Sequence, residues 1–217
     1  MDIFLELKEK NEIVDNEAIM MYLMGNVVAG SDTSASLMRS AVYHVLKTPS
    51  VHDELCNELR AAKLSGLAQW NDIRGLKFLD AVMRESARIA PSIGLMIERV
   101  APDGGLWLPD NRFIPEGTVV GMNPWVVNRT ESIFGSCPDS FDPNRWLQGA
   151  DETKENYHAR LQKMKGTDLT FGHGPRACLG RYLAQMESSK LIATLFNTFD
   201  VRKLLKWTVE QANLISP

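Results

Sequence analysis

Residues 171–180 read FGHGPRACLG and place one cysteine, Cys178, in a tight loop rich in glycine. An apolar stretch with helical spacing follows over 179–196, so the sulfur lies at a helix N-terminus, where the dipole and free N–H groups favour a thiolate. Glycine lets a flat ligand approach the backbone closely, and Arg176 adds a fixed positive charge. A lone cysteine in a turn is more often a buried structural residue. A pattern that fixes five residue types is poorly explained by chance.

Three further patterns precede this loop. Glu85 and Arg88 lie three residues apart on one face of an expected helix, although such pairs usually lie on solvated faces. Arg145 lies in the proline-bracketed stretch CPDSFDPNRW, residues 137–146, where the simplest alternative is a surface arginine. Residues 29–34, AGSDTS, interrupt a long helical pattern with poor helix formers. They predict a bulge, either at a functional site or in a merely kinked, solvent-facing turn.

Apolar spacing predicts helices before Pro91 and mixed structure after it. The first helix is expected to be capped by Asp15 or Asn16, to end at Thr48-Pro49 and to be roughly 45–50 Å long. The expected helices span residues 16–47, 50–63, 76–89 and 179–196. The expected strands of one small sheet span residues 95–100, 105–108, 112–114 and 118–122. Residues 124–170 are expected to be irregular, and residues 200–217 to hold a short strand and a short helix.

Composition excludes several classes of protein. The chain has 217 residues, of which 44% are hydrophobic and 24% charged, so it is not a disordered or low-complexity chain. Lys and Arg number 24 against 27 Asp and Glu; without a basic excess, we expect no nucleic-acid partner. The three cysteines, Cys56, Cys137 and Cys178, are too few and too widely spaced for a disulfide framework. We therefore expect no disulfide partner and a reducing compartment.

The four patterns, in this order, resemble the cytochrome P-450 family, the haem-thiolate monooxygenases. The cysteine loop is similar to the ligand signature of the family, and residues 29–34 to its oxygen-activating segment. Glu85 and Arg88 match its E-x-x-R helix, and Arg145 the arginine that completes a buried structural triad. The overall sequence pattern is most similar to that of fungal microsomal members. The resemblance implies a mainly α fold with a small β-sheet (α+β), in which residues 1–217 are the C-terminal part of a single P-450 domain with no internal boundary.

The resemblance also implies a haem-dependent monooxygenase, which inserts one oxygen atom of O2 into an organic substrate and reduces the other to water. Cys178 would be the axial ligand of the iron of haem b. Arg176 and Arg99 would bind the haem propionates, and Thr33 with Asp32 would relay protons on the catalytic side. The other cofactor-binding residues that it implies are Phe171, Gly172, Gly174 and Gly180. The substrate pocket would include Met24, Val27, Val28, Ile93, Gly94 and Leu95.

By family, electrons would come from NADPH through a flavoprotein reductase, and the substrate would be a small organic molecule. Lys163, Lys165 and Arg181 lie near the cysteine loop in sequence and are candidates for the reductase contact, although each alone is more commonly a solvated cation. The family implies the endoplasmic reticulum membrane. This sequence shows neither a signal peptide nor a ~20-residue apolar span, so the chain itself is expected on the cytoplasmic side or in solution.

Members of the family are much longer, and three interpretations stay open. The chain is the C-terminal half of an intact monooxygenase, or a truncated, catalytically dead relative that serves as a haem-binding or interaction module. The third interpretation is an unrelated helical protein whose motifs match by chance. The identity of the substrate does not follow from these residues.

Overall fold

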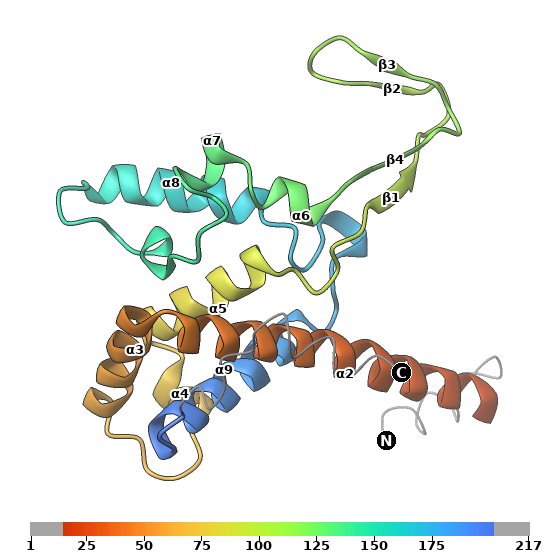
Figure 1. Ribbon diagram of the computed structural model, residues 1–217. Coiled ribbons are helices and arrows are strands. Elements are labelled where there is room, and N and C mark those ends of the chain that lie inside the picture. Colours follow the sequence, from red (N-terminus) through yellow and green to blue (C-terminus); the bar gives the residue numbers. More distant parts are fainter. Residues whose placement is uncertain (1–14, 202–217) are drawn as a thin grey trace, which may run out of the picture.

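The structure, a computed structural model, describes residues 15–201. Its longest element is helix α2, Asn16–Lys47, which crosses the lower half of Figure 1. The Asp15 carboxylate accepts a hydrogen bond of 2.8 Å from the Ala18 amide and caps this helix. Thr48 ends it in front of Pro49. The predicted helix, its cap and its end are confirmed.

The predicted bulge at residues 29–34 is wrong, because helix α2 continues unbroken through them. The Thr33 hydroxyl donates to the Ala29 carbonyl at 2.7 Å, and the Ser31 hydroxyl to the Val28 carbonyl at 3.4 Å. These side chains bond to carbonyls of their own helix and so do not compete for its backbone N–H groups. The polar segment is therefore accommodated without interrupting the helix.

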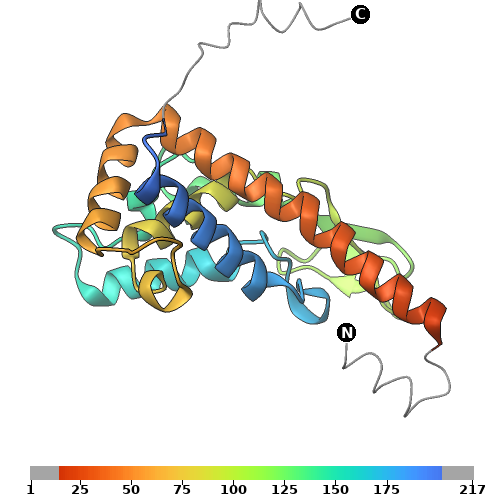
Figure 2. The same ribbon diagram turned by 90° about the horizontal axis from the view of Figure 1, so that it is seen from below.

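Three more helices pack with α2 around the main core. They are α3, Pro49–Ala61; α5, Lys77–Ile89; and α9, Arg181–Thr198. Helix α9 lies beside α2 in both views (Figures 1 and 2) and also contacts α3 and α5. The core includes Ala41, Val45, Leu55, Leu59, Val82, Ile192 and Phe196. The three predicted helices are confirmed with small shifts at their ends; Pro49, rather than Ser50, begins α3.

The segment after Pro91 forms two separate antiparallel pairs instead of the single sheet predicted. Strand β1, Ile97–Val100, pairs with β4, Val119–Met122. Strand β2, Leu106–Trp107, pairs with β3, Phe113–Ile114, in a hairpin that projects from the far end of the first pair (Figure 1). The ladder breaks between the pairs because the chain turns there, with positive φ angles at Gly104, Gly105 and Gly117.

Residues 124–170 hold more regular structure than predicted. Short helices α6, Pro124–Val127, and α7, Glu131–Phe134, precede a 3-10 turn, η1, Pro143–Trp146. Helix α8, Lys154–Thr167, follows a cap in which the Thr153 hydroxyl accepts from the Asn156 amide. Only Met164 of α8 is buried, so no apolar stripe marks this helix in the sequence.

Ala81, Phe134, Trp146 and Met164 form a second, smaller core between α5 and this region. A further short helix, α4, Trp70–Ile73, connects α3 to α5. The predicted class, mainly α with a small β component, is confirmed. The short strand and helix predicted for residues 200–217 lie outside the described residues from residue 202 onward. Within residues 15–201, no helix has both the length and the apolar character needed to cross a bilayer.

Candidate functional site

The cysteine loop lies between helices α8 and α9 and closes on itself. The Cys178 amide donates to the Phe171 carbonyl at 2.8 Å. Gly172 and Gly174 have φ angles of 69° and 68°, in the left-handed region that favours glycine. Gly180 is the N-cap of α9, so Cys178 lies just outside the helix N-terminus, with an exposed, free thiol. The loop thus holds one accessible sulfur at the positive end of a helix dipole.

This loop faces helix α2 across a hollow of about 260 Å³. Thr33 lines one wall and Cys178 another, so the tertiary structure brings together the predicted proton-relay hydroxyl and the predicted ligand sulfur. The other lining residues come from α2, the linker after α5, β1, the cysteine loop and α9; they include Leu37, Ser92, Ile93, Leu169, Phe171, Gly172 and Arg176. A sulfur and a hydroxyl on different walls of an apolar hollow fit a flat ligand held by the sulfur.

Arg99 lines a neighbouring hollow of about 210 Å³, together with Met122 and His173. Ile97 and Leu169 line both hollows, so the two adjoin. Within residues 15–201, neither Arg99 nor Arg176 forms a salt bridge with a carboxylate. Two guanidinium groups without an acidic partner are suited to bind the carboxylates of a ligand.

Several predicted residues lie away from the hollow beside Cys178. Asp32 is exposed and is not among the residues that line it. Of the expected substrate-pocket residues, only Ile93 lines it. Met24, Val27 and Val28 are 55%, 64% and 62% exposed, so they face away from any enclosed site formed by the described residues.

The predicted ion triad is assembled around Glu85, which is completely buried. Arg88, also buried, donates from Nε and Nη2 to the two carboxylate oxygens at 2.8 and 2.7 Å. Arg145 Nε lies 3.4 Å from Glu85 Oε1. The Trp146 indole and the Asp142 amide also donate to this carboxylate, at 2.8 and 3.0 Å. Two charged side chains without solvent contact are thus held by a complete set of partners, which suits a structural role.

Arg88 also anchors two loop segments, at Asn128 and at residues 138–140. Its Nη1 donates to the carbonyls of Asn128 and Pro138, at 2.8 and 2.6 Å, and its Nη2 to that of Ser140 at 3.1 Å. Arg145 donates in turn to the carbonyls of Phe134 and Cys137. The irregular segment before η1 is therefore held on helix α5 by arginine side chains.

Sequence reasoning missed two residues beside the site. The Ser92 hydroxyl donates to the Thr33 carbonyl at 2.9 Å and so ties the linker after α5 to α2 at the hollow. Asn128 is fully buried, and its side-chain oxygen accepts from the Leu169 amide. Serine and asparagine are ordinary loop residues, so no local signal distinguishes these two. Only the chain topology brings them to the site.

The three candidates for the reductase contact have different local surroundings. Lys163 Nζ donates to the Ser132 carbonyl at 2.8 Å and is held against α7. Lys165 is exposed near the end of α8. The Arg181 guanidinium lies over the Tyr182 ring, 4.5 Å from its centroid.

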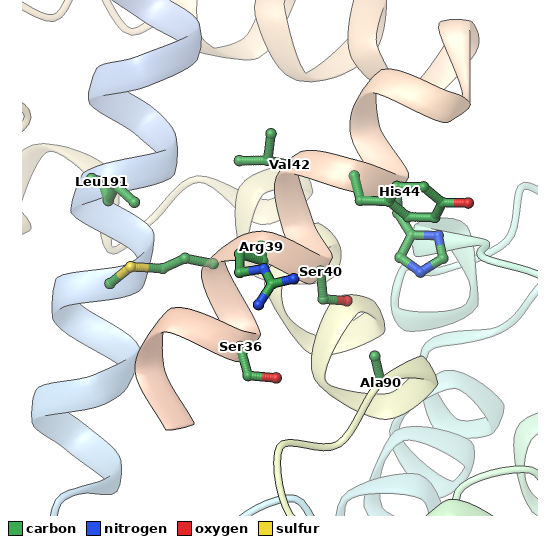
Figure 3. A pocket seen from close by; sticks show the side chains of 9 residues that line it. Ser36, Arg39, Ser40, Val42, His44, Ala90 and Leu191 are labelled. Atoms are coloured by element: carbon green, nitrogen blue, oxygen red, sulfur yellow. The ribbon is translucent and has the colours of Figure 1, made fainter. Parts of the chain in front are cut away.

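A third, more open hollow of about 790 Å³ lies along helix α2 (Figure 3). Its side chains come from α2, the end of α5 and α9, and include Arg39, His44 and Leu191. Burial lowers the pKa of His44, whose ring stacks on Phe141 with centroids 4.6 Å apart. None of the predicted site residues lines this hollow.

Comparison with known proteins supports the family resemblance. The family model for Cytochrome P-450 matches residues 1–211. The cytochrome P-450 monooxygenase cfoH of Aspergillus candidus is 40% identical over 202 residues, covering 92% of this chain and 38% of the relative. The cytochrome P-450 monooxygenase vrtE of Penicillium aethiopicum is 37% identical over 212 residues, covering 96% of this chain and 41% of the relative.

A cytochrome P-450 monooxygenase of Aspergillus terreus is 36% identical over 212 residues and is matched over 42% of its length. The chain therefore spans about two fifths of the length of these fungal relatives. The order of motifs, the helical fold and the sequence matches agree, and the chain belongs to the cytochrome P-450 family.

Proposed function

We propose that this chain forms the haem-thiolate site of a monooxygenase, with Cys178 as the axial ligand of the haem iron. The observation that carries the proposal is the hollow that joins Cys178 to Thr33. When bound, haem supplies the activation of dioxygen, so that one oxygen atom enters an organic substrate and the other leaves as water. The matched relatives are themselves named monooxygenases.

The cofactor would be held by the Cys178 sulfur, by two arginine side chains and by the glycine backbone of the loop. The Cys178 thiolate would bind the iron and increase its electron density. Arg176 and Arg99, which lack acidic partners among residues 15–201, would pair with the two propionates. Gly172 and Gly174 present backbone without side chains, while Phe171 lines the hollow beside the sulfur. Such contacts control solvent access to the ligand.

Thr33 would hold a proton on the catalytic side. Its hydroxyl hydrogen is donated to the Ala29 carbonyl, which leaves the hydroxyl oxygen able to accept a hydrogen bond from water in the hollow. Asp32 is adjacent in sequence and exposed, so its carboxylate is in contact with solvent. The pair would carry protons from solvent to the hollow through water.

The remaining family assignments are part of this proposal. Electrons would come from NADPH through a flavoprotein reductase, the substrate would be a small organic molecule, and the protein would act at the endoplasmic reticulum membrane. Residues 1–217 would be the C-terminal part of one P-450 domain. Glu85, Arg88 and Arg145 would stabilise the fold without taking part in the reaction.

The test is a carbon monoxide difference spectrum of the reduced chain, produced with a supply of haem. We expect a strongly red-shifted Soret band, which Cys178→Ser abolishes. Cys137→Ser is the matched control, because Cys137 is also an exposed, free cysteine outside the hollow; it should keep the band. A folded chain without bound haem, or a band that survives Cys178→Ser, contradicts the proposal. Haem-free folded protein would instead favour the interaction module.

A further inference from the structure

We infer that Asn128 is a positioning residue that couples the buried Glu85–Arg88 pair to the cysteine loop; this rests on the proposed role of Cys178 as ligand. Asn128 is the C-cap of helix α6, distant in sequence from both Arg88 and Cys178. It is completely buried, which is rare for an asparagine. Its backbone and its side chain contact two different parts of the molecule.

The backbone and side chain of Asn128 each accept one hydrogen bond that crosses between elements. Its carbonyl accepts from Arg88 Nη1 at 2.8 Å, and Arg88 is itself held by Glu85. Its side-chain Oδ1 accepts from the Leu169 amide at 3.4 Å. One residue therefore links the ion cluster of α5 to the start of the cysteine loop.

Leu169 transmits this link to the sulfur. The Leu169 carbonyl accepts from the Gly172 amide at 2.9 Å, and the Phe171 carbonyl accepts from the Cys178 amide at 2.8 Å. The Leu169 side chain lines both hollows, next to Phe171 and Cys178 in one and Arg99 in the other. A displacement of Leu169 therefore moves both the loop that holds the sulfur and the wall of the site.

The side-chain nitrogen of Asn128 shows that the amide group is not needed simply for packing. Its Nδ2 is buried, with no hydrogen-bond partner in the part of the chain that the structure describes. An unmade buried donor is unfavourable, whereas an apolar side chain of similar volume avoids that penalty. The amide therefore contributes through its oxygen, by fixing Leu169, rather than through the stability of the fold.

Amide hydrogen exchange in the haem-free full chain tests this directly. Asn128→Leu removes the acceptor. Asn123→Leu is the matched control, because Asn123 caps the other end of the same helix and accepts from the Trp125 amide at 2.8 Å. Asn128→Leu should speed exchange in residues 169–178 about five- to tenfold, the change expected from one lost hydrogen bond. Asn123→Leu should leave this segment unchanged.

Three results would overturn the inference: unchanged exchange in Asn128→Leu, the same change in Asn123→Leu, or a uniform increase over all helices. Asn128→Ala replaces Asn128→Leu if the leucine does not fit. Hydrogen exchange is measured without haem, so its outcome tests the role of Asn128 independently of the proposed haem site. Selective loosening in a chain that fails to bind haem supports the positioning role while refuting the monooxygenase site. Haem binding with unaltered exchange refutes only the role of Asn128.

Discussion

The buried carboxylate of Glu85 joins four residues from different parts of the chain. It accepts from two arginines, an indole and a backbone amide, contributed by α5, by η1 and by Asp142 just before η1. Because Glu85 and Arg88 are both completely buried, water cannot replace a lost partner. Removing one member of such a group leaves an uncompensated charge inside the protein.

Glu85→Gln is therefore expected to lower the free energy of unfolding by about 3–5 kcal/mol. Asp80→Asn is its control on the same helix, because Asp80 pairs with Arg84 at 2.7 Å but is 59% exposed. That change should cost less than about 1 kcal/mol. Urea unfolding followed by circular dichroism measures both. Equal effects of the two substitutions would show that burial of the triad contributes no special stability.

At the scale of elements, helix ends are held by side chains from other elements as well as by their own caps. Helix α5 has no side-chain cap from its own N-cap residue, Leu76. The Glu58 carboxylate, from α3, accepts from the Phe78 and Leu79 amides, both at 2.8 Å. Two otherwise unsatisfied donors of the first turn are thereby paired by a charge that suits the helix dipole.

Glu58→Ala should lower the free energy of unfolding by about 1–3 kcal/mol, because two charge-assisted bonds to α5 are lost. Glu54→Ala lies on the same helix α3 and is exposed, so it should change stability by less than about 0.5 kcal/mol. Thermal or urea unfolding gives both values. A Glu58→Ala protein as stable as Glu54→Ala would rule out this cap.

Helix α8 is joined to the loop before it by one ion pair. Arg160 donates to both carboxylate oxygens of Glu152, each at 2.8 Å, and to the carbonyls of Arg145 and Leu147. The hydrogen bond from Arg160 lowers the pKa of Glu152 from its ordinary 4.5 to about 2. The pair links the position of α8 to the backbone at Arg145.

This shift predicts a pH dependence with a defined sign. A depressed folded-state pKa stabilises the protein above the unfolded value, and that contribution disappears as the pH falls from about 4.5 to about 2. The wild-type chain should therefore unfold at higher urea than Glu152→Gln near neutral pH. The difference between their midpoints should shrink as the solution is acidified through this range. A difference that stays constant, or grows, contradicts the pairing.

At the scale of the whole molecule, the first half of α2 carries several exposed apolar groups. On the first half of α2, Met20, Met24, Val27 and Val28 are all more than half exposed, and Leu179 after Cys178 is 100% exposed. Apolar surface on this scale marks sites of contact or aggregation. The exposed part of α2 leads directly to Thr33 and the hollow beside Cys178.

We expect the isolated chain to self-associate through this part of α2. Met24→Glu with Val27→Lys should reduce association without loss of helix content, because both positions are exposed. Lys154→Glu with Glu155→Lys is the control, since it exchanges exposed charges on α8 and covers no apolar surface. Sedimentation velocity at several concentrations distinguishes them. Association that both double variants share would place the contact elsewhere.

The sequence alone was sufficient for features that depend on neighbours along the chain. A cap at Asp15 or Asn16, the end of α2 at Thr48 and the existence of helices α5 and α9 were all predictable. Caps, prolines and helical spacing act within a few residues, so their signals survive in a single sequence. The loop around Cys178 was recognisable for the same reason, because its glycines and cysteine are adjacent.

Only the tertiary structure decided which distant groups meet. It placed Thr33 opposite Cys178, Ser92 on the Thr33 carbonyl and Asn128 between Arg88 and Leu169. It also showed α2 unbroken at Thr33, and α8 held by Arg160 rather than by an apolar stripe. Hydrogen bonds between distant segments depend on where packing leaves a donor or carbonyl unpaired. A pattern of neighbouring residues therefore does not predict which distant groups form these hydrogen bonds.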